Sequence, residues 1–173
     1  IHLSETAAFL NAEELIDASL LGAFHESPDR FMVLESTAEG NSGWWYDTWH
    51  QALSMWPRTL LRPIFLPYFS GDDIYPTVTE LRRNPIPADW TPAPRTVKHQ
   101  EAAETAARTN PDLKRYLGRD WKLSREKMWW WETERENYKR KKELNLFYQE
   151  FASNPEESFQ SQNISAFDTD LIS

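Results

Sequence analysis

Cysteine is absent from this 173-residue sequence, and only five residues are glycine. Without Cys the chain can form no disulfide, Cys-ligated zinc site, iron–sulfur cluster or Cys nucleophile. No apolar run approaches the roughly 20 residues that span a bilayer, so we expect no membrane partner. The glycine patterns that cradle nucleotide phosphates, G-x-x-x-x-G-K-[ST] and G-x-G-x-x-G, are also missing. By itself, the chain is therefore not expected to bind a nucleoside triphosphate in the usual way.

Histidine is sparse, and its four residues are scattered: His2, His25, His50 and His99. Scattered histidines are more often structural or surface residues than metal ligands. We therefore predict no metal site in this chain.

Four late carboxylates raise the alternative of a metal-dependent nuclease site: Glu156, Glu157, Asp168 and Asp170. The first two follow Asn154-Pro155 and are typical first-turn acids of a helix. The last two lie in a polar tail with no strand to hold them. A nuclease site here is therefore not favoured.

Charge is unevenly spread along the chain. The net charge is −8, yet residues 114–142 hold 11 basic and 5 acidic side chains. Such asymmetry is often typical of a segment that faces a polyanion. The alternative is a solvated helix braced by salt bridges, and composition alone does not separate the two.

The first 70 residues alternate between strand and helix patterns. Residues 1–3 end an apolar strand, residues 31–34 form a short apolar run typical of a strand buried on both faces, and residues 63–69 resemble a third strand. Apolar side chains recur at helical spacing over residues 12–24 and 45–56. This alternation predicts a parallel α/β sheet.

From Ser70 the strand patterns stop and proline becomes frequent. We therefore expect residues 70–96 to form an irregular connection bounded by prolines. Helices are expected over residues 97–108 and 124–142, and Asn154-Pro155 predicts the start of another. In the second of these helices, Met128, Trp131 and Tyr138 share one face.

Three consecutive tryptophans, Trp129 to Trp131, lie in the basic helix. At about 100° per residue they cannot share a face, so one or two are expected in a core and at least one on another surface. Aromatic rings beside Arg and Lys can stack on bases and bind phosphate. Packing in the core and between subdomains is the favoured explanation.

Two polar turns follow predicted strands. Ser4 and Glu5 come directly after the first strand, and Glu35 to Gly40 end the second. Ligands of open parallel sheets bind at the carboxyl ends of the strands, where a carboxylate can activate water and hydroxyls can bind phosphate. The alternative for Ser4 and Glu5 is a polar strand end or loop, and the alternative for the second turn is a capped turn, since Ser and Thr also satisfy helix N-termini.

Taken in order, these motifs resemble the ATPase domain of the large terminase subunit of tailed phages. The resemblance begins with Ile-His-Leu-Ser-Glu-Thr-Ala (1–7), Asn-Ala-Glu-Glu-Leu (11–15) and Val-Leu-Glu-Ser-Thr-Ala-Glu-Gly (33–40). It continues with Trp44-Trp-Tyr-Asp-Thr-Trp49, Phe65-Leu-Pro-Tyr-Phe69, Trp121-Lys-Leu, Phe147-Tyr-Gln-Glu-Phe151, Pro155-Glu-Glu-Ser-Phe159 and Ala166-Phe-Asp. It covers nearly the whole chain, and the Glu-Ser-Thr-Ala turn before an aromatic helix is its most specific part.

The resemblance implies a piece of a DNA-packaging motor. Its fold would be α/β, a partial RecA-like P-loop ATPase sheet followed by a mainly helical linker or lid subdomain. Residues 1–70 would form the C-terminal half of the ATPase core, and residues 71–173 the Pro-rich connection and helical subdomain. The phosphate-binding loop would lie before Ile1 and the acidic nuclease cluster beyond Ser173, so this fragment alone is expected to be inactive.

The resemblance also implies roles for individual residues. Ser4 and Glu5 match the Walker B pair, with Glu5 polarising the attacking water. Ser4 stands where many such ATPases have Asp, so magnesium would depend more on the missing loop. Ser36, Thr37 and Ala38 match the coupling motif that senses the γ-phosphate.

The partners that the family implies are ATP and Mg²⁺ in the intact parent, double-stranded DNA, the portal protein and the small terminase subunit. The parent would act in the bacterial cytoplasm as a homo-oligomer assembled on the portal. The basic run Lys139, Arg140, Lys141 and Lys142 is the candidate DNA-binding segment. The alternative function is a non-catalytic, basic, Trp-rich module that binds DNA or a partner protein.

Overall fold

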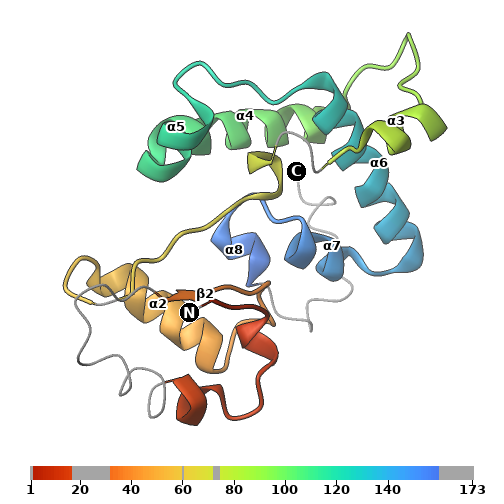
Figure 1. The fold of residues 1–173 in the computed structure, drawn as a ribbon. Helices are drawn as coiled ribbons and strands as arrows, with labels where there is room; N and C mark the ends of the chain where they lie inside the picture. Colours follow the sequence, from red (N-terminus) through yellow and green to blue (C-terminus); the bar gives the residue numbers. More distant parts are fainter. Residues whose placement is uncertain (1, 17–31, 60, 72–74, 160–173) are drawn as a thin grey trace. The chain divides into compact units, whose positions relative to one another are not determined.

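The computed structural model describes residues 2–16, 32–59, 61–71 and 75–159 (Figure 1). These residues are mainly helical and contain a two-stranded parallel sheet, which is consistent with the predicted α/β class. The chain divides into two compact units: Ile1–Pro63 with Ser158–Ser173, and Ile64–Glu157. The assignment of residues 1–70 to an ATPase core and of residues 71–173 to a helical subdomain stays a prediction.

The first unit contains a parallel pair of short strands. β1 (His2–Leu3) pairs with β2 (Val33–Leu34), with His2 opposite Val33 and Leu3 opposite Leu34. Both strands lie inside the predicted strand segments. β2 is half-buried, so the expectation that it is buried on both faces is wrong for its described residues.

Helical turns follow β1 in the first unit. A 3-10 helix, η1 (Thr6–Ala8), comes first, and residues 12–16 are also helical. The remainder of the helix predicted over residues 12–24 lies outside the described residues.

The long helix of the first unit is α2 (Trp44–Met55), as the Trp spacing predicts. It begins after Gly43, whose φ of 94° disfavours any other residue. It ends at Trp56-Pro57, because a residue before Pro is driven away from helical conformation. Phe159 packs on this helix, with its ring centroid 5.3 Å from that of Tyr46.

The third strand predicted over residues 63–69 is wrong. Residues 61–67 adopt no regular secondary structure, and a 3-10 helix, η3 (Tyr68–Ser70), follows them. Pro63 and Pro67 lack the N–H that a sheet ladder needs. Within the segment, Tyr68 and Phe69 are buried in the core of the second unit, whereas Ile64 and Leu66 are exposed.

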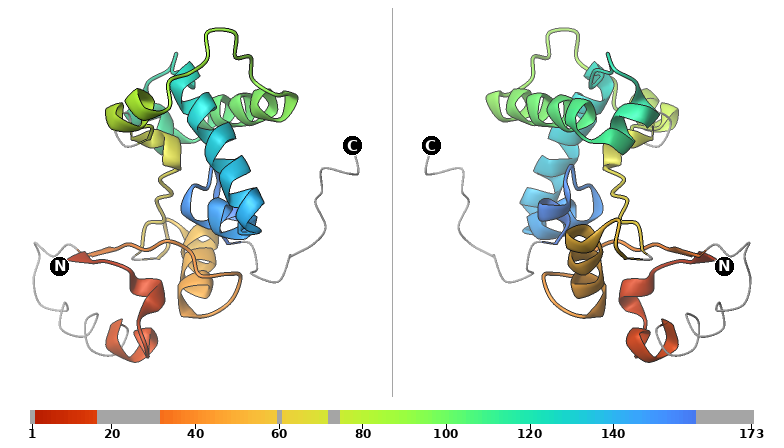
Figure 2. Two further views of the ribbon diagram at one scale, coloured as in Figure 1. Left: turned by 90° about the vertical axis from the view of Figure 1, so that its right-hand side faces the viewer. Right: turned by 90° about the vertical axis from the view of Figure 1, so that its left-hand side faces the viewer.

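The second unit is built from helices, whose arrangement Figure 2 shows from two sides. Their bounds are α3 (Val78–Arg83), α4 (Pro94–Thr109), α5 (Pro111–Leu117), α6 (Arg125–Lys141), α7 (Leu144–Glu150) and α8 (Pro155–Ser158), whose last residue belongs to the first unit. α4 and α6 confirm the helices predicted over 97–108 and 124–142. α8 confirms the predicted start, since the Asn154 Oδ1 accepts a hydrogen bond from the Glu157 N–H at 2.8 Å.

The connection predicted as irregular over residues 70–96 contains a helix, so that prediction is wrong in part. α3 has a complete capping box: the Thr77 hydroxyl accepts from the Glu80 N–H, and the Glu80 carboxylate accepts from the Thr77 N–H. These two hydrogen bonds satisfy backbone N–H groups at the start of the helix that have no partner within it, and so they stabilise a short helix.

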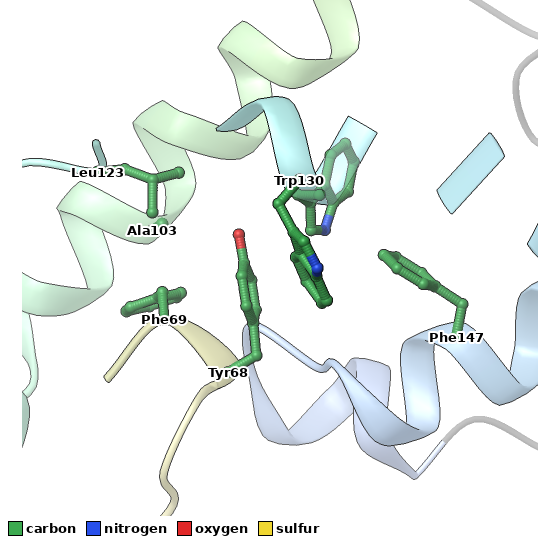
Figure 3. Packing of buried hydrophobic residues seen from close by; sticks show 7 residues of the cluster. Tyr68, Phe69, Ala103, Leu123, Trp130 and Phe147 are labelled. Carbon is green, nitrogen blue, oxygen red and sulfur yellow. The ribbon is translucent and has the colours of Figure 1, made fainter. Parts of the chain in front are cut away.

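The core of the second unit is aromatic (Figure 3). Its buried members are Tyr68, Phe69, Ala103, Leu123, Trp130, Trp131 and Phe147. Trp129 is only half-buried and packs edge-on against Trp90, with ring centroids 5.3 Å apart. The expectation that the three tryptophans divide between the core and another surface is confirmed.

His99 is buried in this core between polar and aromatic partners. Its Nε2 lies 2.9 Å from the Tyr68 hydroxyl and its Nδ1 3.4 Å from the Ser153 hydroxyl, and its ring stacks on Trp131 at 4.0 Å. Burial lowers the pKa of His99 from 6.5 to about 4, because the imidazolium would lose its hydration.

This burial predicts acid sensitivity. Between pH 6.5 and 4 the unfolded chain binds a proton at His99 that the folded chain does not, so stability falls as pH falls through that window. The contribution of His99 drops by about 2 kcal/mol between pH 7 and pH 5. Burial raises the pKa of Glu157, which acts in the opposite direction, so a variant is needed to isolate His99.

The measurement is urea unfolding of wild type and His99→Gln at pH 7 and pH 5, followed by Trp fluorescence. The wild type is expected to lose about 2 kcal/mol more than the variant on acidification. Equal losses in the two proteins would show that His99 has the same pKa in the folded and unfolded states and is not buried.

Candidate functional site

The candidate site lies where β1 and β2 end. Because the strands are parallel and in register, the residues that follow them leave the sheet at the same end, the carboxyl end of both strands. Ser4 and Glu5 follow β1, and Glu35 with the predicted coupling residues follows β2. The structure therefore brings together the two turns that the sequence singles out, which are about thirty residues apart.

Hydrogen bonds join the two turns. The Glu35 N–H donates to the Leu3 carbonyl at 2.9 Å, and the Glu35 carbonyl accepts from the Thr6 N–H at 3.1 Å and the Thr6 hydroxyl at 3.2 Å. One residue further, the Ser36 hydroxyl accepts from the Ala7 N–H at 3.2 Å. The β1 turn is thus fixed to the β2 turn on both sides of Glu5.

Glu5 has a left-handed backbone, with φ 56° and ψ 40°. Few non-glycine residues adopt this conformation, and it is common at functional sites. Its carboxylate belongs to an exposed residue and is available to solvent or ligand. Glu5 lies where the sequence predicts, and its catalytic role stays a prediction.

Ser4 contacts Glu35 across the strand ends, and its predicted Walker B role stays a prediction. Its hydroxyl donates to Glu35 Oε1 at 2.7 Å, and His2 Nε2 lies 3.4 Å from Glu35 Oε2. The Ser4 hydrogen bond lowers the pKa of Glu35, and the contacts with His2 also lower it. Glu35 is therefore held as a carboxylate at the strand ends.

Sequence patterns alone assign no role to Glu35, His2 or Thr6. The available signal is positional: Glu35 ends β2 as Ser4 ends β1, and a parallel register puts such residues beside each other. The register itself is a long-range pairing, so the partner of Ser4 cannot be read from local patterns.

The predicted coupling residues follow Glu35 in the β2 turn. Ser36 and Thr37 are half-buried, and Ala38 is buried, at 2% exposure. Their burial increases along the turn, so a movement at Ser36 must be accommodated by packing around Ala38.

A hollow of about 360 Å³ lies beside these turns in the first unit. It is lined by Ala7, Phe9, Asn11, Ala12, Glu13, Glu39, Gly40, Ser42, Gly43, Trp44, Trp45 and Tyr46. Two carboxylates line it and no Lys or Arg does, so its charge disfavours a polyphosphate. The hollow does not replace the phosphate-binding loop that the sequence lacks.

The basic segment 114–142 divides into internal and surface groups. Lys127 and Arg135 are buried: Lys127 donates to the Gly71 and Tyr75 carbonyls, and Arg135 donates to the Tyr148 hydroxyl at 2.8 Å. Lys122 pairs with the buried Glu104 at 2.7 Å. This part of the charge surplus stabilises the second unit, as the salt-bridge alternative predicts.

The candidate DNA-binding residues are on the surface. Lys139, Arg140, Lys141 and Lys142 are all exposed at the C-terminal end of α6. Cations there also complement the negative end of the helix dipole, so their position fits either a structural or a DNA-binding use.

The alternative nuclease residues do not form a cluster in the described part of the chain. Glu156 and Glu157 belong to the first turn of α8, and Glu157 accepts from the Ser153 N–H at 2.8 Å. Asp168 and Asp170 lie outside the described residues. Among the described residues, no group of three or more His, Cys, Asp or Glu side chains could hold a metal ion.

No helix in the described segments has the length and apolar character required to cross a membrane. Comparison of the chain with protein-family models, curated proteins and solved structures finds no match.

Proposed function

We propose that this chain is part of a large terminase subunit, the ATP-driven motor that packages phage or prophage DNA. Its first unit would be the later part of a RecA-like ATPase core, and its second unit the helical linker or lid. The observation that carries the proposal is the hydrogen-bonded pair of strand-end turns, which holds the turn containing Glu5 against the turn containing Ser36.

This arrangement supports the roles that the family resemblance implies. Glu5 provides an exposed carboxylate that can orient and deprotonate a water molecule. Ser36 and Thr37 provide hydroxyls that can sense a phosphate. The phosphates themselves would be held by a glycine-rich loop outside these 173 residues, since this sequence has no such motif.

Magnesium fits the donors at the strand ends. Ser4 and Glu5 present a hydroxyl and a carboxylate, which are oxygen ligands of the kind that Mg²⁺ prefers. When bound with ATP, Mg²⁺ would neutralise charge on the phosphates. Because Ser4 brings no charge, magnesium would depend more on the phosphate-binding loop outside these 173 residues.

The experiment that tests this function is ATP hydrolysis by the full-length protein, with and without linear duplex DNA. We expect magnesium-dependent turnover that duplex DNA changes. Full-length protein that binds no ATP would contradict the proposal.

A second function, the non-catalytic binding module, is favoured by one observation. The second unit has its own aromatic core and an exposed basic helix end. These features suffice to bind DNA or an acidic protein without any ATPase chemistry.

The basic helix end gives a prediction that applies to both functions. Replacing Lys139, Arg140, Lys141 and Lys142 with Gln is expected to weaken binding to duplex DNA and to leave the melting temperature nearly unchanged. The salt dependence should also fall, by about 0.9 in the log–log slope for each phosphate that the variant no longer neutralises. The measurement is fluorescence anisotropy of a labelled duplex at several salt concentrations.

The matched control replaces four exposed cations elsewhere in the second unit: Arg82, Arg83, Lys114 and Arg115. It changes the net charge equally, so only a local site distinguishes the two variants. A lowered melting temperature with unchanged DNA affinity in the α6 variant would show that the basic run braces the protein and does not face DNA.

A further inference from the structure

Both residues that flank Glu5 are attached to Glu35. On one side the Ser4 hydroxyl donates to the Glu35 carboxylate at 2.7 Å. On the other side the Thr6 N–H and hydroxyl donate to the Glu35 carbonyl at 3.1 and 3.2 Å. The two neighbours of Glu5 in the sequence are thus both hydrogen-bonded to Glu35.

The conformation of Glu5 requires such an anchor. In the left-handed region the Cβ of an L-residue crowds its own backbone, so a free Glu leaves this region readily. A strained conformation persists only where the surroundings determine it. The hydrogen bonds to Glu35 tie Ser4 and Thr6 to the other strand end, and these two residues determine the path of the chain through Glu5.

We propose that Glu35 is a positioning residue for Glu5: its side chain, through Ser4, holds Glu5 in the left-handed conformation that directs its carboxylate out of the strand end. This inference rests on the proposed function, in which Glu5 is the catalytic base. Glu35 acts as a hydrogen-bond acceptor, so its geometry matters more than its charge.

The same contacts connect the turn that contains Glu5 with the turn that contains the proposed coupling residues. Glu35 directly precedes Ser36, and the Ser36 hydroxyl accepts from the Ala7 N–H two residues beyond Glu5. A displacement of the β2 turn therefore moves the anchors of Glu5 on both sides. The coupling residues can thus set the orientation of the base directly, without a larger rearrangement.

The first test uses the 173-residue chain and does not depend on ATP. The backbone chemical shifts of Glu5 report its φ and ψ by NMR. In Glu35→Ala and Ser4→Ala we expect the Glu5 shifts to move from left-handed to ordinary values, and in Glu35→Gln we expect them to stay, because the amide oxygen still accepts from Ser4. A left-handed Glu5 in both alanine variants would overturn the proposal.

The second test uses ATP turnover by the full-length protein. Glu35→Ala and Ser4→Ala are each expected to lower kcat by about tenfold, with KM for ATP changed less than about twofold, because misplacing a catalytic group affects the chemical step. The double variant should be no worse than either single variant, since both remove one hydrogen bond. Glu35→Gln should retain most of the activity.

Glu39→Ala is the matched control, because Glu39 is an exposed carboxylate of the same turn. Decreases in kcat that multiply in the double variant, or an equal decrease in Glu39→Ala, would overturn the positioning role. Failure of the proposed function gives a different result: the wild type would not hydrolyse ATP, while the NMR test would still decide whether Glu35 holds Glu5.

Discussion

Replacing Glu5 with Gln in the full-length protein is expected to lower ATP turnover by roughly 10²–10⁴-fold. Gln has nearly the same shape as Glu, but its amide cannot accept a proton from water. The left-handed backbone and the anchoring of Ser4 and Thr6 should be retained, since neither contact involves the Glu5 side chain. The decrease should therefore appear in kcat alone.

The measurement is steady-state ATP hydrolysis combined with calorimetric titration of a non-hydrolysable ATP analogue. ATP affinity is expected to stay within a few-fold of wild type, since a glycine-rich loop outside this chain would bind the phosphates. Glu39→Gln, in the neighbouring turn, controls for removal of a surface charge. If Glu5→Gln turns over within a few-fold of wild type, another carboxylate is the base.

Replacing Phe147 with Ala is expected to destabilise the protein by about 3–5 kcal/mol. Phe147 is fully buried, at 0% exposure, and its ring packs against aromatic neighbours: Trp131, Tyr138, Tyr148 and Phe151. Truncation removes this apolar packing and leaves a cavity that the surrounding rings cannot easily fill. Such a destabilisation is a large fraction of the stability of an ordinary domain.

The measurement is the free energy of unfolding in urea, followed by Trp fluorescence. Leu146→Ala is the matched control, since Leu146 is the preceding residue of α7 and is 42% exposed. Its free energy of unfolding should be within about 1 kcal/mol of wild type. An equal effect of the two substitutions would mean that the aromatic cluster is not the core of the second unit.

Several helices are predictable from this sequence because apolar spacing and capping residues are local features. α2, α4 and α6 follow from apolar spacing, and α8 from Asn154-Pro155. The short helix α5 begins with the same signal, Asn110-Pro111, and the Asn110 side chain caps it, yet apolar periodicity did not predict it. In a Pro-rich stretch such caps predict short helices better than apolar periodicity does.

Features that depend on tertiary packing could not be predicted. The apolar run at 63–69 resembles a strand, but its buried residues Tyr68 and Phe69 pack against helices. Lys127 and Arg135 are buried cations that a count of charges assigns to the surface. At the candidate site, the turns were predictable from the positions of Ser4 and Glu5 after a strand, whereas the bond from Ser4 to Glu35 depends on strand register.

The central claim is that these residues belong to a P-loop ATPase, and the most direct measurement is the amino-acid sequence encoded upstream of Ile1. We expect a continuous reading frame with a G-x-x-x-x-G-K-[ST] motif within roughly 150 residues before Ile1. A natural start close to Ile1, with no such motif before it, would contradict the account and favour the non-catalytic binding module.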